Sequence, residues 1–579
     1  MKWSMQVQLA AAAALAAGWA GEPADASPQE PEGRPFGPVA EPRAIDGTGN
    51  HAEEAERGAA LTPLRRELST AYGDGAGSPS GADRASARFV SSGALSQPGD
   101  RPNSAGVSDM FWQWGQFLDH DITETPVEVP SVSFPIPVPT GDIWFDPLGT
   151  GVEVIPLSRS FGLRVDSRRE QVNAITAWID GSQVYGSDEE RAIALRAMDG
   201  SGKLKVSEGD LLPFNVDGLH NAPSDAATNF FLAGDVRANE QVALTAMHVL
   251  FLREHNYWAE RIAEEDANWI RRQRRREAGD GQRGHGGSGG GRGLSRDDLL
   301  DRRLSHLTGD EIYELARAMV SAEIQRVTYR EWLPILLGPG ALPAESVYRP
   351  ELDGTIRNSF ATAAFRIGHS MLSPQLLRLD ERGVEIPEGH LSLSDSFFSP
   401  ATLIATGIDP LLRGLLAQPA QELDVFVIDE VRNFLFGPPG AGGLDLVALN
   451  IQRGRDHGLP SYGQAMRDLG LAAPSSFGQI SSDPEVVERL SRVARSPETL
   501  DLWVGGLAED HLPGALVGPT FYELLVRQFE ALRDGDRLWH TRQLGPALLR
   551  ILDRQSMATI LDRSSGLTRQ EVRDPFLAR

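Results

Sequence analysis

The sequence predicts a mainly α-helical protein with one large domain, which extends from about residue 43 to residue 579. Apolar residues recur with the period of about 3.6 residues that a buried helix face requires, most clearly in residues 110–121 and 308–320. Strand-like alternation of apolar and polar residues is scarce. A hydrophobic share of 41% is sufficient for a large packed core. These observations favour one helical domain over a sheet-based or fibrous protein.

The charge and the absence of cysteine exclude several classes of function. Lys and Arg number 56 and Asp and Glu number 80, so the formal net charge is −24. Nucleic-acid binding relies on basic side chains that neutralise phosphates, and this balance disfavours it. Because the chain has no cysteine, disulfide scaffolds, zinc–thiolate sites, iron–sulfur clusters and thiol catalysis are excluded. A bound metal has to use His, Met, carboxylate, hydroxyl or carbonyl ligands.

The N-terminal residues predict export. Lys2 precedes a short apolar run at residues 9–17, and small residues offer cleavage sites at residues 18–20 and 24–26. This is the order of a secretory signal peptide, here residues 1–20, with a disordered alanine-rich tail as the alternative. Residues 21–42 are rich in Pro, Glu and Gly and predict a flexible linker. No apolar run reaches the roughly 18 residues that a membrane span needs, so we expect a secreted, periplasmic or extracellular protein without one.

Residues 110–121 carry the most informative pattern. On a helix, Phe111, Trp114 and Leu118 form one apolar stripe, because they are spaced at i, i+3 and i+7. A different face carries three polar side chains at i, i+3 and i+4, namely Gln116, Asp119 and His120. A His beside an Asp on a helix is commonly a structural pair. The convergence of three polar groups among large aromatic residues indicates a functional site.

Residues 176–187 form a loop with hard oxygen ligands. Thr176, Asp180 and Ser182 fall on even offsets, so an extended loop would turn their oxygens to one side. Calcium takes about six to eight oxygen ligands at flexible angles, and this set suits it. The alternative is that these hydroxyls only cap the loop. The loop lacks a second carboxylate, which therefore has to come from another segment.

The next segments predict two helices separated by an insertion. Residues 233–241 contain Arg237 and Glu240 and lead into residues 242–262, whose apolar residues cover both faces of a buried helix. Between residues 271 and 296 a run of arginines is followed by Gly and Ser. This composition predicts a disordered, solvated surface insertion, with binding to an anionic surface as the alternative. Thr308 and Glu311 have the spacing of a capping box that begins the next helix.

Two later stretches add candidate ligands. Residues 365–370 contain Arg366 and His369, and residues 448–458 contain Asn450 and Arg453. Taken alone, each is open to a structural interpretation, because a lone Arg is usually a surface charge and a lone His is usually satisfied by its neighbours.

Taken in order, these five stretches resemble the animal-type haem peroxidases of the peroxidase–cyclooxygenase superfamily. Further similarity at residues 45–50, 503–507 and 535–539 extends the resemblance over nearly all of the chain after residue 42. It implies a helical fold with haem b between distal and proximal helices. It also implies a secreted enzyme that reduces hydrogen peroxide and oxidises small anions, such as iodide, thiocyanate or bromide, or phenolic donors. The alternative is a peroxidase-fold adhesion or matrix protein with secondary activity; the oligomeric state stays open.

The resemblance also assigns roles around the iron. His120 matches the distal histidine, Gln116 the residue that helps to hold water and halide above the iron, and Arg237 the distal arginine. On the other side, His369 matches the proximal ligand. Asn450 matches the residue that hydrogen-bonds its other ring nitrogen, with the Asn carbonyl as the expected acceptor. Arg366 and Arg453 fall where the family places positive groups near the haem and its propionates.

The remaining correspondences concern covalent links, calcium and specificity. Asp119 and Glu240 match the carboxylates that form ester bonds to the haem in mammalian members. The calcium site that the resemblance implies combines side chains with the carbonyl of Trp178: Asp121, Thr176, Trp178, Asp180 and Ser182. Gln241 stands where myeloperoxidase carries a haem-linked methionine, so a weaker oxidant is expected. Arg366 stands where the cyclooxygenases have their radical-forming tyrosine, which disfavours that branch.

Overall fold

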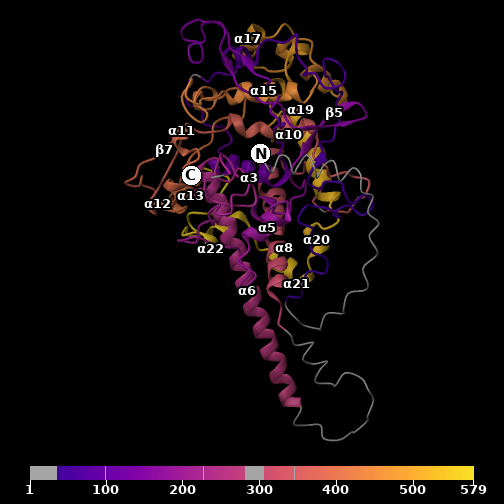
Figure 1. Ribbon diagram of the computed structural model, residues 1–579, viewed down its shortest axis with the longest axis vertical. Helices are drawn as coiled ribbons and strands as arrows, with labels where there is room; N and C mark the ends of the chain where they lie inside the picture. Colours follow the sequence, from indigo (N-terminus) through magenta and orange to yellow (C-terminus); the bar gives the residue numbers. More distant parts are fainter. Residues whose placement is uncertain (1–35, 98, 226, 281–305, 345, 579) are drawn as a thin grey trace.

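The computed structural model describes residues 36–97, 99–225, 227–280, 306–344 and 346–578. The predicted helical fold is confirmed, since helices make up most of the regular structure (Figure 1). The predicted signal peptide lies outside the described residues. Of the expected linker, the structure describes residues 36–42; Phe36 is 4% exposed and packs in the main core, while the residues after it are exposed or half-buried.

Among the described residues, six helices have ten or more residues: α3 (Asp109–Ile122), α6 (Val242–Asp280), α8 (Gly309–Val327), α15 (Leu446–Asp456), α17 (Pro484–Val493) and α19 (Pro519–Asp534). Shorter α-helices connect them: α2 (Ala87–Ala94), α4 (Ser182–Tyr185), α5 (Glu189–Leu195), α9 (Leu333–Leu336), α10 (Asn358–Thr362), α11 (Leu393–Ser396), α12 (Pro400–Thr406), α13 (Asp409–Ala417), α14 (Asp429–Arg432), α16 (Tyr462–Asp468), α18 (Leu502–Ala508), α20 (His540–Gln543), α21 (Pro546–Leu552) and α22 (Met557–Ser564). One π-helical and three 3₁₀ segments complete the set: η1 (Thr328–Trp332), η2 (Ala364–Ser370), η3 (Phe477–Gln479) and η4 (Pro497–Thr499).

The described strands are short and antiparallel, as the scarcity of alternating patterns predicts. One sheet has the order β1 (Thr62–Pro63), β5 (Arg168–Asn173) and β4 (Gly162–Val165). Two pairs complete the set, β2 (Ile136–Pro137) with β3 (Val154–Ile155) and β6 (Gln375–Leu376) with β7 (Leu391–Ser392). Ile136, Ile155 and Leu376 of these strands belong to the main core.

Helix α3 runs through the main core and packs against α4, α6, α13 and η2. Its predicted apolar stripe is confirmed, because Phe111, Trp114 and Leu118 are each at most 1% exposed. Phe117 stacks on Phe251 of α6 with ring centroids 4.8 Å apart, and the ring of Trp114 lies 5.8 Å from that of Phe251. This apolar packing fixes the rotation of α3 about its axis, so that its polar face is turned away from the apolar core.

Helix α6 is longer than predicted. Its buried part at residues 242–262 is confirmed, but the helix continues through the arginine run to Asp280 and projects from the body of the molecule (Figure 1). Arg271 donates hydrogen bonds to the carbonyl of Ala267 and to Asn268 on the preceding turn. The expectation that the disordered insertion begins at residue 271 is therefore wrong, because Arg, Ala and Glu are good helix formers. Residues 281–305 lie outside the described chain.

Helix α8 begins at the predicted capping box. The Thr308 hydroxyl accepts a hydrogen bond from the backbone N–H of Glu311, and the Glu311 carboxylate accepts one from the backbone N–H of Thr308 at 2.7 Å. None of the helices that the structure describes combines the length and hydropathy needed to cross a bilayer.

Candidate active site

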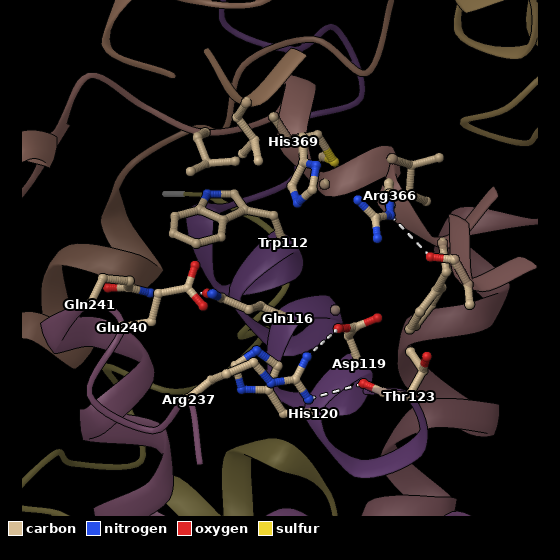
Figure 2. A pocket seen from close by; sticks show the side chains of 18 of the residues that line it. Trp112, Gln116, Asp119, His120, Thr123, Arg237, Glu240, Gln241, Arg366 and His369 are labelled. Atoms are coloured by element: carbon tan, nitrogen blue, oxygen red, sulfur yellow. Dashed lines mark hydrogen bonds and ion pairs between the residues drawn. The ribbon is translucent and has the colours of Figure 1, made fainter. Parts of the chain in front are cut away.

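A cavity of about 430 Å³ lies between α3, the loop that precedes α6, and η2. Figure 2 shows His369 and Arg366 on one side of it and His120 and Arg237 on the opposite side, with Glu240 and Asp119 on opposite flanks. Eight of the predicted site residues line this cavity: Gln116, Asp119, His120, Arg237, Glu240, Arg366, His369 and Arg453. Segments that are far apart in the sequence therefore converge on one site.

His120 lies on the polar face of α3, as its spacing from Gln116 predicts. Its side chain is 3% exposed, and burial, followed by the nearby charge of Arg237, lowers its pKa well below the usual value. The ring is therefore neutral at pH 7 and able to accept a proton. Its Nδ1 lies 3.4 Å from a carboxylate oxygen of Asp235, which leaves Nε2 for the cavity.

Asp235 is a site residue that the sequence reasoning missed. It accepts hydrogen bonds from Arg237, at 3.0 Å from Nε to Oδ1 and 2.7 Å from Nη2 to Oδ2. Arg237 Nη2 also donates to the carbonyl of Thr123 at 2.9 Å, and its Nη1 lies 3.4 Å from Asp119. Burial alone would lower the pKa of Arg237, but the carboxylates of Asp235, Asp119 and Glu124 together raise it. The guanidinium is thus fixed in position and stays charged.

A glycine lets the Arg237 loop reach this position. A Cβ atom at Gly234 would lie 2.2 Å from the carbonyl oxygen of Ser182, at the start of α4. Any larger residue would push the loop away from α4 and with it Asp235, whose backbone N–H donates to the Gln183 carbonyl at 3.1 Å. Gly234 therefore allows the loop that carries Arg237 to pack against residues 182–183.

Three glutamines form a hydrogen-bonded group at the edge of the distal wall. Gln241 Nε2 donates to Oε1 of Gln113 and, at 3.2 Å, to Oε1 of Gln116, and Gln113 Nε2 donates to the same Gln116 oxygen at 3.2 Å. Gln241 Oε1 accepts from the backbone N–H of Ala243 at 2.7 Å, so its orientation is fixed. Because the Gln116 carbonyl oxygen is occupied, its amide N–H groups are left to face the cavity. The roles of Gln113 and of this group were not predicted.

The proximal side consists of His369 on η2 and Asn450 on α15. Burial, followed by the charge of Arg366, lowers the pKa of His369 to about 3, so the ring is neutral. The predicted contact with Asn450 is present, at 2.7 Å, but it involves Asn450 Nδ2 and His369 Nδ1. The Asn450 carbonyl oxygen, the expected partner of the ring, instead accepts a hydrogen bond from Arg366 Nη1 at 2.8 Å.

Cationic and acidic groups flank the cavity. Burial lowers the pKa of Arg366 to about 10, which still leaves the side chain charged at pH 7. Arg453 Nη1 donates to the Ser158 carbonyl at 2.9 Å and to the Ser160 hydroxyl at 2.8 Å. Burial raises the pKa of Asp119 to about 6 and that of Glu240 to about 7, so both are partly protonated near neutral pH.

The predicted calcium ligands lie behind α3, away from the cavity. Ser182 donates its backbone N–H to Asp121 Oδ1 and its hydroxyl to the Asp121 carbonyl, both at 2.6 Å. Thr176 Oγ1 lies 3.3 Å from Asp180 Oδ2, and the Trp178 carbonyl accepts from the Asp180 backbone N–H at 2.9 Å. The five residues therefore come together as predicted. Ser182 begins helix α4 and does not continue an extended loop, because Gly181 at φ +83° turns the chain.

The two carboxylates of this group face each other in the interior, with Arg317 and Arg43 as the cations near Asp180. Asp121 and Asp180 are fully buried, and Asp180 Oδ1 has no hydrogen-bond partner among the described residues. Burial and then the charge of Asp180 raise the pKa of Asp121 well above its usual range, and burial raises that of Asp180 to about 6. No cluster of three or more His, Cys, Asp or Glu side chains suited to a metal occurs in the described ranges, so a cation here would depend on two carboxylates plus hydroxyls and carbonyls.

Comparison with known proteins agrees with this geometry. The family described as animal haem peroxidase matches residues 42–576. The chain is 35% identical to peroxidasin of Drosophila melanogaster over 556 residues, which cover 86% of this chain and 33% of peroxidasin. It is 32% identical to peroxinectin A of Dictyostelium discoideum over 545 residues, 90% of this chain and 93% of peroxinectin A. The chain thus spans about a third of the peroxidasin that it matches.

Solved structures show the same fold. Peroxidase A from Dictyostelium discoideum superposes with a TM-score of 0.79 at 29% identity, over 93% of this chain and 100% of that one. The fatty acid alpha-dioxygenase of Oryza sativa superposes with a TM-score of 0.70 at 20% identity, over 90% of this chain and 84% of that one, which shows the fold alone. Since the family match covers nearly the whole described chain and the site residues converge on one cavity, the protein belongs to the animal haem peroxidase family.

Proposed function

We propose that this protein is a secreted haem peroxidase that reduces hydrogen peroxide and oxidises small anions, such as iodide, thiocyanate and bromide, or phenolic donors. The observation that carries the proposal is the placement of His120 and Arg237 across one cavity from His369 (Figure 2). A neutral imidazole on one wall suits an iron ligand, and a neutral base beside a fixed guanidinium on the other wall suits peroxide. Haem iron, when bound, supplies the redox chemistry of the O–O bond.

The residues of this chain then move one proton and stabilise one charge. His120 takes a proton from one peroxide oxygen and returns it to the other oxygen, which leaves as water. Arg237, held by Asp235, stabilises the negative charge that develops as the O–O bond breaks. Because Asp235 and the Thr123 carbonyl fix the guanidinium beforehand, little reorganisation is needed at that moment.

His369 and its partner hold the cofactor on the opposite side. Iron on Nε2 requires the ring proton on Nδ1, so the Asn450 carbonyl has to become the acceptor. Arg366 and Arg453 line the same cavity and would supply positive charge to the carboxylates of the group, which is the role that the resemblance implies for them. Asp119 and Glu240 line opposite flanks of the cavity (Figure 2), which supports the proposal that they form the ester links to haem b that the family resemblance implies.

A panel of electron donors tests this function. Purified haem-loaded protein is expected to consume hydrogen peroxide in the presence of iodide, thiocyanate, bromide or a phenol, in proportion to the donor oxidised. A protein that acts in adhesion or in a matrix is the second candidate, favoured by the match to peroxinectin A over 93% of its length. Haem-loaded protein that leaves peroxide unconsumed with every donor, yet supports cell attachment, would replace the first proposal with the second.

Replacement of Gln241 is expected to change anion specificity. Gln116 and Arg237 offer N–H groups to a small anion, and Gln241 holds Gln116 in this orientation. The wild type is expected to oxidise iodide, thiocyanate and bromide, with chloride poor or inert at neutral pH, because Gln241 has no sulfur to form a haem link. In Gln241→Met we expect gain of chloride oxidation and a red-shifted Soret band. Rapid production of hypochlorous acid by the wild type at neutral pH would contradict this prediction.

We also propose that calcium binds between α3 and α4. Two buried, adjacent carboxylates and the unpaired Asp180 Oδ1 fit a hard cation, with Thr176, Ser182 and the Trp178 carbonyl as further ligands. Asp121 follows His120 directly, so the ion would also fix the end of the distal helix.

Loss of a calcium ligand is expected to lower metal content, stability and activity together. In Asp180→Asn, the bound calcium measured by elemental analysis and the melting temperature should both fall. Asp445→Asn is a matched control, because Asp445 is equally buried. Its ion-pair partner at 2.7 Å is Arg88, which belongs to α2 and not to α4. This variant should lower the melting temperature and leave bound calcium unchanged. Active wild-type protein that contains no calcium removes the site.

A further inference from the structure

A third carboxyl group, that of Glu124, lines the cavity and has no part in the chemistry described above. Glu124 lies just beyond the end of α3, and the carbonyl of the preceding residue, Thr123, accepts a hydrogen bond from Arg237 at 2.9 Å (Figure 2). The Glu124 backbone is held at both polar groups, because its N–H donates to Asn173 Oδ1 and its carbonyl accepts from the N–H of Ala174, both at 2.7 Å. Glu124 therefore has a fixed place on the distal side of the cavity, next to Arg237.

The carboxyl group of Glu124 differs from the other two in the cavity wall, those of Asp119 and Glu240. Both of these are the proposed ester residues, and Asp119 also lies 3.4 Å from Arg237 Nη1. The Glu124 carboxyl group accepts no hydrogen bond and forms no ion pair among the residues that the structure describes; only longer-range charges act on it. Its side chain is half-buried and opens onto the cavity. Glu124 is thus the carboxyl group that a molecule in the cavity can contact.

Two guanidinium groups oppose the effect of burial on this carboxyl group. Burial, with the charge of Asp235 as a smaller contribution, raises the pKa of Glu124 to about 7, while Arg237 and, more weakly, Arg191 lower it. The side chain of Arg191 donates its hydrogen bonds to two backbone carbonyls. The ionised and the neutral form of Glu124 are therefore both populated at neutral pH, and the carboxylate is the main form at pH 8.

A carboxylate at this place acts in opposite directions on the two classes of electron donor. A phenol loses its hydroxyl proton when it loses an electron, so a base in contact with the hydroxyl group assists its oxidation. A small anion such as iodide has no proton to lose. A negative charge close to Arg237 also repels it and weakens the niche that Arg237 and Gln116 offer to anions. The ionised Glu124 therefore favours phenols and disfavours anions.

We infer that Glu124 selects phenolic donors over small anions and accepts the proton of the phenol. The phenol hydroxyl donates a hydrogen bond to the Glu124 carboxylate; one electron leaves the phenol for the peroxide-oxidised haem, and the hydroxyl proton passes to Glu124. The products are a phenoxyl radical, a neutral Glu124 carboxyl group and a haem reduced by one electron. Two such steps supply the two electrons and two protons with which the second peroxide oxygen leaves as water. This inference rests on the proposed peroxidase function.

Two donors, phenol and iodide, test this role in haem-loaded full-length protein at pH 8 and saturating peroxide. In Glu124→Gln the kcat/KM for phenol should fall about 10- to 100-fold, because a proton acceptor is lost. The kcat/KM for iodide should rise about three- to tenfold, because a repelling charge is removed. Without peroxide, a spectral titration with thiocyanate should show tighter binding by a similar factor. Glu128→Gln is the matched control, since Glu128 is ion-paired with Arg169 and does not line the cavity; it should change none of the three.

The outcomes separate this inference from the function on which it rests. A wild type that oxidises both donors, with a Glu124→Gln variant in which both rates fall, both stay, or only one of them changes, overturns the role of Glu124 and leaves the peroxidase function standing. A wild type that oxidises neither donor overturns both. Haem content and melting temperature report whether the variant folds, and both should be kept because the substitution breaks no hydrogen bond of the carboxyl group. If Glu124→Gln does not bind haem, Glu124→Ala is measured with the same donors and decides.

Discussion

Replacement of His369 by alanine is expected to abolish stable haem binding. His369 lies on η2, its Nδ1 is occupied by Asn450, and its Nε2 is left for the cavity. The chain has no cysteine, and the other histidine of the cavity, His120, belongs to the opposite wall. Met371 also lines the cavity, two residues after His369, but no second imidazole is placed to replace the lost ligand on that side. We expect His369→Ala to purify with little haem, measured by the ratio of Soret to protein absorbance.

A control variant and a rescue experiment test whether the loss of haem is specific to His369. His255→Gln removes another buried imidazole, which bonds the Tyr185 hydroxyl at 3.0 Å and the Gly202 carbonyl at 2.9 Å and does not line the cavity. It should retain haem. The space left by the smaller side chain in His369→Ala should admit free imidazole, and millimolar imidazole should restore haem binding. Haem retained in His369→Ala with an unchanged spectrum would show that another residue is the axial ligand.

The sequence predicts best those features that depend on neighbours along the chain. The polar face of α3 follows from spacings of three and four residues, and the capping box of α8 from a spacing of three. Both features follow from helix geometry and do not depend on contacts with other segments of the fold. The arginine run shows the limit of composition, because its residues extend α6 although the following Gly and Ser suggested an early end.

The atoms of the site depend on contacts between distant segments. Asn450 has two possible amide orientations, and Arg366 on η2 selects one by occupying the carbonyl oxygen. Gln116 is oriented by Gln241, 125 positions away. Asp235 is close to Arg237 in the sequence, yet only the fold shows that it also approaches His120. The only signal for Asp235 in the sequence is its position two residues before Arg237. An Asp at that position could equally form a salt bridge or cap a loop.

Removal of either distal group is expected to slow the reaction with peroxide by orders of magnitude. His120 is neutral and buried, and its acid–base role is worth about 10²–10⁴-fold. His120→Ala should lower the rate of peroxide-driven haem absorption change by that factor in stopped-flow measurements. Arg237→Ala should lose about 10²–10³-fold, the size expected for one group that stabilises developing charge. Both variants should keep most of their haem, because His369 is intact.

The two variants also differ in the charge that remains in the site. In Arg237→Ala the buried Asp235 loses its partner, so part of the lost rate and stability reflects an uncompensated carboxylate beside His120. The double variant Arg237→Ala with Asp235→Asn removes that charge and should recover stability, but not the rate. His390→Ala, at a position that does not line the cavity, is the matched histidine control and should react at the wild-type rate. A wild-type rate in His120→Ala would contradict the assignment of the proton acceptor, because no other neutral base lies on that wall among the residues that line the cavity.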